Sequence, residues 1–124
     1  MRVLVVEPGR RPEVREIDGS LRSMQEIVGS LIQPVYPFDD PVALVRNDEG
    51  KVMDLPANRG LRDENGQIYD IVSGTFFLCG APDNSDHFTS LAPEQIKQYE
   101  ERFHTPEKFW GMDGHIVCLP LEVD

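Results

Sequence analysis

Two prolines bracket the stretch that most constrains the fold of this chain, residues 35–45, which read VYPFDDPVALV. Proline has no backbone N–H to donate and fixes its own φ. Pro37 and Pro41 therefore have to lie at an edge or a corner of a sheet rather than inside a ladder. The flanking residues are strand formers, so the pattern predicts extended segments at 32–38 and 41–46, joined at a corner by the acidic pair between the prolines.

Two turn signals after this corner divide the middle of the chain. Asn47-Asp48-Glu49-Gly50 predicts a hairpin in which residues 51–53 form the returning strand, because its glycine suits a positive φ. Asp63-Glu64-Asn65-Gly66 predicts a second hairpin of the same chemistry. The segment between the hairpins, residues 55–61, has no strand-like alternation and is predicted to be irregular.

Residues 67–79 form the part of the chain that is densest in strand formers. The run predicts a buried central strand, with Gly74 at a bulge or a close approach. Alternation along a strand places Phe76 and Phe77 on opposite faces of the sheet. The second face then needs a cover, which is either the C-terminal segment from Trp110 or a partner molecule.

Two segments have the apolar spacing of a helix. The first begins after Ser20, a good N-cap, and ends at Gly29. The second spans residues 93–103 and starts with a proline, which fits the first turn, although Ala92 stands where a capping side chain is expected. Thr105-Pro106-Glu107 predicts a further short helical turn, with the threonine as its cap.

Three further segments complete the expected fold. Residues 2–7 and 12–17 are predicted to pair as strands, and residues 115–123 to form an edge strand or to reach a neighbouring subunit. The order of the elements argues against repeated βαβ units. We predict a single α+β domain, residues 1–124, with a mostly antiparallel sheet of five to seven strands and two main helices packed on one face.

The charge of the chain bears on its partners. It has 22 Asp and Glu against 12 Lys and Arg, a formal net charge of −10, and its basic residues are scattered, which disfavours direct binding of nucleic acid. The acidic balance has two interpretations: it keeps the protein in solution, or it forms an acidic surface that engages a basic groove of a partner.

Other features of composition bear on where the protein acts. No run approaches the ~18 apolar residues of a membrane span. The N-terminus, MRVLVVEPGRRPE, lacks the cleavage site of a signal peptide and is predicted to be a strand. We therefore expect a cytoplasmic protein that binds no membrane, with Cys79 and Cys118 as reduced thiols.

No motif in the sequence defines a reaction. The chain has neither GxGxxG nor GxxxxGK[ST], and its three histidines lie far apart without metal-binding spacing. The nearest polar cluster, Asp83, Asp86 and His87, is typical of a solvated loop. Cys79, at the end of an apolar strand, is typical of a small buried hydrophobe rather than a nucleophile. We therefore expect no metal and no cofactor.

The acidic pair Asp39 and Asp40 has two interpretations as well. The carboxylates could take part in acid–base chemistry if Tyr36 and Phe38 removed one of them from water. Alternatively, they cap a corner between prolines, where aspartate is favoured for its own hydrogen bonding to the backbone.

Four ordered blocks of the chain resemble one known family. They read VLVVEPGRRPEVREIDGSLRSMQEIVG, VYPFDDPVALVRNDEGK, LPANRGLRDENGQIYDIVSGTFF and SLAPEQIKQY. In these blocks, from about Val3 to about Phe103, the chain resembles the Domain of Unknown Function 3846 family. Its members are small bacterial proteins, often encoded on conjugative elements and phages of gut Firmicutes. The resemblance implies a mobile-element accessory protein without an assigned activity. It brings no catalytic residues, and it leaves residues 104–124 as a C-terminal extension.

Two functional hypotheses from different classes remain open. The first is a non-enzymatic binding or regulatory protein that acts through an acidic or aromatic surface, with an unknown protein partner or by self-association. The second is a small-ligand binder or an enzyme of unrecognised type, and a concave, partly apolar pocket would favour it. The residues that would line this pocket are Tyr36, Phe38, Asp39, Asp40, Asn58 and Arg59.

Arg59 leads to a more specific expectation. It has no acidic neighbour within two positions, and it lies in the segment predicted to be an irregular loop, where binding residues concentrate. The corner carboxylates precede it by one hairpin. We predict an ion pair or a hydrogen bond between Arg59 and Asp39 or Asp40, with an unpaired surface arginine as the alternative.

Overall fold

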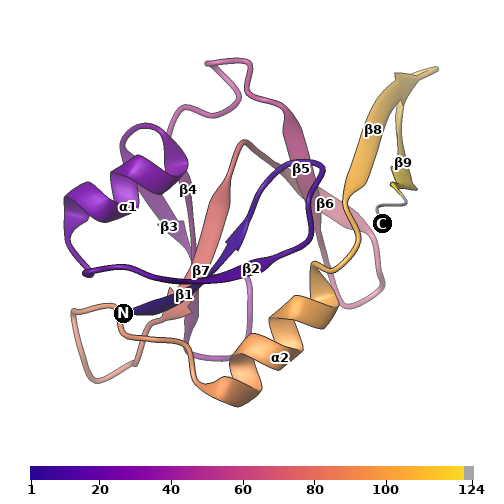
Figure 1. Ribbon diagram of the computed structural model, residues 1–124. Helices are drawn as coiled ribbons and strands as arrows, with labels where there is room; N and C mark the ends of the chain where they lie inside the picture. Colours follow the sequence, from indigo (N-terminus) through magenta and orange to yellow (C-terminus); the bar gives the residue numbers. More distant parts are fainter. Residues whose placement is uncertain (122–124) are drawn as a thin grey trace.

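The computed structural model describes residues 1–121 and shows a central sheet of five strands, ordered β2-β1-β7-β4-β3 (Figure 1). Every neighbouring pair in this sheet is antiparallel. Strands that are distant in the sequence lie side by side in this order, because β7 lies between β1 and β4. The strands of this sheet are β1 (Arg2–Val6), β2 (Glu13–Glu16), β3 (Ile32–Val35), β4 (Val42–Asn47) and β7 (Phe76–Gly80).

The three middle strands of the sheet are buried on both faces. Val3 and Val5 of β1 point to one face and Leu4 and Val6 to the other, and all four are inaccessible to water. Phe76 and Phe77 divide in the same way, as the alternation predicts. Such strands appear in the sequence as continuous apolar runs rather than as alternating ones.

The two helices cover opposite faces of this sheet. Helix α1 (Leu21–Val28) packs Met24 and Val28 into the cluster that contains Phe77. Helix α2 (Pro93–Arg102) packs Tyr99 into the cluster that contains Phe76. The prediction that both helices lie on one face is therefore wrong. It failed because a two-sided sheet needs a cover on each side, and α1 supplies the cover that was expected from the C-terminal segment or a partner.

The predicted helix ends are confirmed in detail. The Ser20 hydroxyl oxygen accepts the Ser23 N–H at 3.0 Å, and Gly29 ends α1 in the left-handed region with φ 88°. At the start of α2, Ala92 has no capping side chain, as expected. The Gln95 side chain compensates in part by accepting the Ala92 N–H at 2.9 Å.

A second, two-stranded sheet corrects the prediction for the middle of the chain. Strand β5 (Ala57–Arg62) occupies most of the segment that was predicted to be irregular, and it pairs with β6 (Ile68–Ser73) around the predicted turn at 63–66. Residues 51–53 form turns rather than a returning strand. The predicted long strand 67–79 is divided at Gly74, whose φ of 81° ends β6 and starts the path to β7 in a different sheet.

The C-terminal part forms a hairpin of its own, which extends away from the central sheet (Figure 1). Strand β8 (Glu107–Met112) pairs with β9 (His115–Pro120) around Asp113 and Gly114, both with positive φ. The expected helical turn at 105–107 is therefore wrong, because Glu107 already belongs to β8. The expected strand 115–123 is confirmed as far as Pro120, and Val123 lies outside the described residues.

Candidate functional site

The corner between β3 and β4 is fixed in place by helix α2. Phe38 packs its ring on Tyr99, with centroids 4.7 Å apart, and Asp40 Oδ2 accepts a hydrogen bond from the Tyr99 hydroxyl at 2.9 Å. Burial and this hydrogen bond both raise the pKa of Tyr99, so the phenol stays protonated and donates. Both prolines lie at the corner, as predicted, although β3 ends at Val35 and the extended segment was expected to reach residue 38.

A hollow of about 470 Å³ lies between this corner and the loop at residues 81–88. Four carboxylates line it, together with His87, and among the described residues no lysine or arginine contributes to its lining. The aromatic side chains of Tyr36, Phe38 and Phe88 also line it. The four carboxylates belong to Asp39, Asp40, Asp83 and Asp86. The hollow therefore combines negative charge with aromatic surface.

A second hollow of about 560 Å³ lies on the other side of the same corner, towards α2 and β5. Its lining is mixed in charge, because it includes the guanidinium groups of Arg62 and Arg102 as well as carboxylates. Arg102 stands over the Phe38 ring at 4.9 Å from the centroid. A cation of the chain itself thus already occupies one face of that ring.

The hollows bring together four of the six residues predicted to form a binding site: Tyr36, Phe38, Asp39 and Asp40. The other two, Asn58 and Arg59, are buried elsewhere, at 0% and 1% exposure. The Asn58 amide donates to the carbonyls of Val6 and Gly74, each at 2.9 Å, and so joins β5 to the central sheet.

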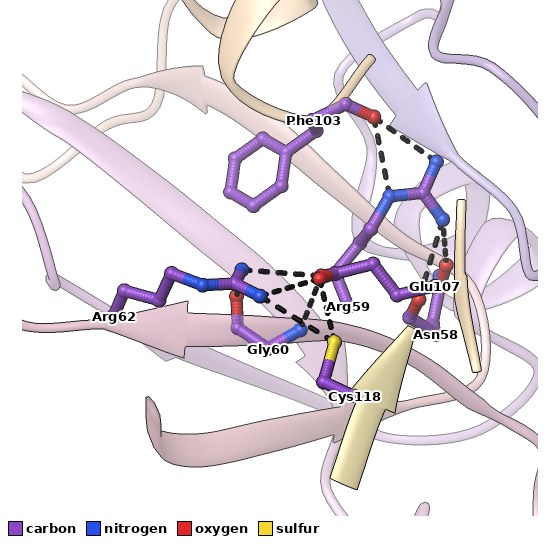
Figure 2. Close-up of polar contacts among 7 residues, drawn as sticks. All are labelled: Asn58, Arg59, Gly60, Arg62, Phe103, Glu107 and Cys118. Carbon is purple, nitrogen blue, oxygen red and sulfur yellow. Dashed lines mark hydrogen bonds and ion pairs between the residues drawn. The ribbon is translucent and has the colours of Figure 1, made fainter. Parts of the chain in front are cut away.

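Arg59 uses its guanidinium entirely inside the protein (Figure 2). Nε donates to the Phe103 carbonyl at 3.1 Å, and Nη2 donates to the same carbonyl and to that of Arg10. Nη1 donates to the carbonyl and the side-chain oxygen of Asn58. These five hydrogen bonds equal the five N–H donors of the group. The predicted contact with Asp39 or Asp40 is therefore wrong, and so is the alternative of a surface arginine.

The position of Arg59 gives it a structural role. It ties three distant segments together: strand β5, the β1–β2 connection at Arg10 and the C-terminal end of α2 at Phe103. The last carbonyls of a helix carry partial negative charge, which suits a buried cation. Burial lowers the pKa of Arg59 to about 10, and the nearby Glu107 opposes that shift.

A second polar cluster fastens the C-terminal hairpin to β5 (Figure 2). Glu107 accepts hydrogen bonds from both Nη atoms of Arg62, from the Gly60 N–H at 3.0 Å and from the Cys118 thiol at 2.9 Å. Burial alone would raise the pKa of Glu107, but these bonds outweigh it and hold the pKa below its ordinary value. The sequence interpretation assigned no role to Glu107 or Arg62.

Neither cysteine is prepared for nucleophilic chemistry. Burial raises the pKa of Cys79 to about 12, and burial together with the hydrogen bond to Glu107 raises the pKa of Cys118 to about 11. The thiolate, which is the reactive form, is therefore a very minor species near neutral pH. Within residues 1–121, no three His, Cys, Asp or Glu side chains are grouped so as to hold a metal ion.

Fold and site together define a small α+β protein, with a two-faced antiparallel sheet and an acidic, aromatic hollow at one corner. The chain belongs to the family described as a domain of unknown function, DUF3846, whose model matches residues 1–104. The match ends just before β8, so the C-terminal hairpin follows the family domain. No curated protein and no solved structure matches the chain. Neither helix in the described part of the chain has the length and apolar character to cross a membrane.

Proposed function

We propose that this chain is a non-enzymatic binding or regulatory protein of a mobile genetic element, and that it binds a cationic group of a protein partner in the acidic hollow beside the β3–β4 corner. The observation that carries the proposal is the lining of that hollow, where carboxylates and aromatic rings stand together without a lysine or arginine of the described chain. The mobile-element setting follows from what the family resemblance implies.

The chemistry of the lining favours an ammonium or guanidinium group. A carboxylate gives such a group a charge-assisted hydrogen bond, and the face of an aromatic ring attracts it through the ring quadrupole. Tyr36 is 63% exposed, so its ring is available at the rim. A lysine or arginine side chain carries both the charge and an aliphatic stem that can lie against the rings.

A small cationic ligand is the second candidate for the same hollow. The volume of about 470 Å³ falls within the range of ligand pockets, roughly 300–1,000 Å³, and the hollow is partly apolar. Both candidates use the same residues, and they differ in whether the cation is presented by a protein surface or by a free molecule.

A peptide titration tests the proposal. The probe is a short peptide of alternating lysine and arginine, and binding is followed by two-dimensional NMR. We expect shifts confined to the corner and the 81–88 loop, and at least a tenfold weaker affinity for the double variant Asp83→Asn/Asp86→Asn. The matched control removes the same charge from the 48–54 turn, at the other end of β4, by Asp48→Asn/Asp54→Asn.

Two results of this titration would refute the proposal. Equal loss of affinity in both double variants would show that only the net charge attracts the peptide. Shifts that lie elsewhere on the surface would place the cation-binding site outside the hollow. A free ligand such as arginine amide that binds as tightly as the peptide would favour the second candidate.

A further inference from the structure

The β8–β9 hairpin has one partly covered and one bare face. The strand register places Glu107, Phe109, Ile116 and Cys118 on one side, where Glu107 and Cys118 contact Gly60 and Arg62 of β5 while Ile116, nearer the tip, is 62% exposed. The opposite side is formed by Lys108, Trp110, Met112, His115, Val117 and Leu119. On this side Trp110 is 47% exposed, Met112 63% and Leu119 50%. A two-stranded sheet is only marginally stable on its own, so further strands added at its edge would stabilise it.

The outer edge of β9 is also open. In residues 1–121, β9 pairs only with β8. The Leu121 N–H bonds to the Pro106 carbonyl at 2.7 Å, and a two-residue loop of positive φ at Asp113-Gly114 closes the other end. Hydrogen-bonded pairs alternate along an antiparallel ladder. Counting along β9 from either end therefore gives the same result. The N–H groups of Ile116 and Cys118 point away from β8, towards the open edge.

This edge lacks the features that usually protect an edge strand. Natural edges carry lysine or other charges, internal prolines or bulges, which prevent pairing with another strand. Residues 116–119 read IVCL, without a charge, and the only proline of β9 is Pro120 at its end. The register of β9 against β8 is regular over all six residue pairs, so no bulge bends the edge away.

The charge of the hairpin removes the main obstacle to self-association. Two copies of a chain with a net charge of −10 repel each other over most of their surface. The hairpin residues 107–120 carry Glu107, Asp113 and Lys108, a sum of −1, and Glu107 is paired with Arg62. The hairpin is thus close to neutral, and Figure 1 shows that it extends away from the acidic body.

We propose that two copies of this chain associate through β9, which pairs antiparallel with its counterpart across a two-fold axis to form a continuous four-stranded sheet. An antiparallel edge is self-complementary, because each strand offers the donors and acceptors that the other needs. The apolar faces of the two hairpins then join into one surface. One strand pair contributes less than the roughly 800 Å² per partner of a standard interface, so the dimer is weak and depends on concentration.

The test is sedimentation of the full chain over a concentration series from low micromolar to about 0.5 mM, a range that covers weak association. We expect the mass to rise from 14.1 kDa towards twice that value. Ile116→Pro removes an outward N–H without touching the β8 ladder, and it should weaken the dimer at least tenfold. Leu119→Glu should act similarly, because it adds a negative charge where two chains of net charge −10 meet, while Lys108 opposite it in β8 can pair with it. Val52→Glu, which changes an 86% exposed apolar side chain in a distant turn, is the control and should dimerise as the wild type does.

Amide hydrogen exchange provides a second measurement that needs no variant. The Ile116 and Cys118 amides should exchange more slowly as the wild-type concentration rises, whereas the amides of the 48–54 turn should not change. A monomer mass throughout the series would overturn the proposal, as would a β9 that pairs only with a strand of another protein. A dimer that is unaffected by Ile116→Pro, or concentration-independent exchange at both amides, would overturn it as well. The inference does not involve the acidic hollow, so either proposal can fail alone.

Discussion

Replacement of Arg59 tests whether its guanidinium is a structural tie rather than a binding group. Arg59→Met removes the charge and all five donors while keeping most of the side-chain length. The buried acceptors on Phe103 and Asn58 then lose their partners, whereas the Arg10 carbonyl lies on an exposed residue and can turn to water. Each buried acceptor left unsatisfied costs about 1–3 kcal/mol. The substitution also removes the cost of burying a cation, which offsets part of that loss. We therefore expect the free energy of unfolding to fall by about 2–4 kcal/mol.

Arg59→Lys separates this explanation from a role in charge alone. Lysine keeps the positive charge in the same dry position, but its single nitrogen cannot reach the Phe103, Arg10 and Asn58 oxygens together. It therefore retains the desolvation cost and loses several of the hydrogen bonds. We expect Arg59→Lys to be at least as destabilising as Arg59→Met, although lysine is the more conservative change by charge.

Urea unfolding followed by far-UV circular dichroism measures both variants. At a slope of about 2 kcal/mol per molar urea, in the middle of the usual range, the expected loss lowers the midpoint by about 1–2 M. The control is Arg22→Met, because Arg22 is 89% exposed and pairs with Glu26 on the surface of α1. It should change stability by less than about 0.5 kcal/mol. A wild-type midpoint for Arg59→Lys, or a gain in stability for Arg59→Met, would refute the assignment of Arg59 as a structural tie.

Three further predictions concern the clusters around the hairpin and the corner. Glu107→Gln should speed amide exchange across the hairpin, unlike Glu64→Gln in an exposed turn. The pKa of Glu107 is lowered in the folded state, so its stabilisation is complete above about pH 4.5 and is lost as the pH falls through the lower value. Protection of the hairpin amides, corrected for the intrinsic effect of pH, that does not fall on acidification would contradict this. Tyr99→Phe should cost about 1–2 kcal/mol in urea unfolding through the lost hydrogen bond to Asp40, and a neutral result would mean that water replaces it. Cys118 should react with iodoacetamide at pH 8 on the order of a hundredfold more slowly than a free thiol, as its raised pKa requires, and a rate like that of free cysteine would contradict the pKa.

Local patterns in the sequence predicted the elements whose stability depends on near neighbours. The caps at Ser20 and Gly29, the corner prolines and the hairpin turn at 63–66 all act within a few residues, and the structure confirms each of them. The C-terminal hairpin could also have been predicted from the sequence, because Asp113-Gly114 between alternating residues is a strong hairpin signal. The sequence interpretation missed it by extending helical chemistry from Thr105.

The candidate site was predictable only where its residues are neighbours in sequence. Tyr36, Phe38, Asp39 and Asp40 lie on one corner, so any hollow beside that corner includes them. Their partners from the 81–88 loop reach the hollow only because β7 pairs with β4, which brings Ala81 to Pro41. Asn58 and Arg59 were assigned to the site because their segment looked like a loop, whereas it is a strand that faces inward.

The sequence by itself determined where the two helices lie and where the chain turns at 63–66 and at the proline corner, since capping and turn chemistry are local. Tertiary structure alone decided which face each helix covers, and it decided the partners of Arg59. The distant partners lie 44 and 49 residues away, at Phe103 and Arg10, and they are backbone carbonyls. Every residue carries such a carbonyl, so no side-chain pattern marks the ones that a buried guanidinium will meet.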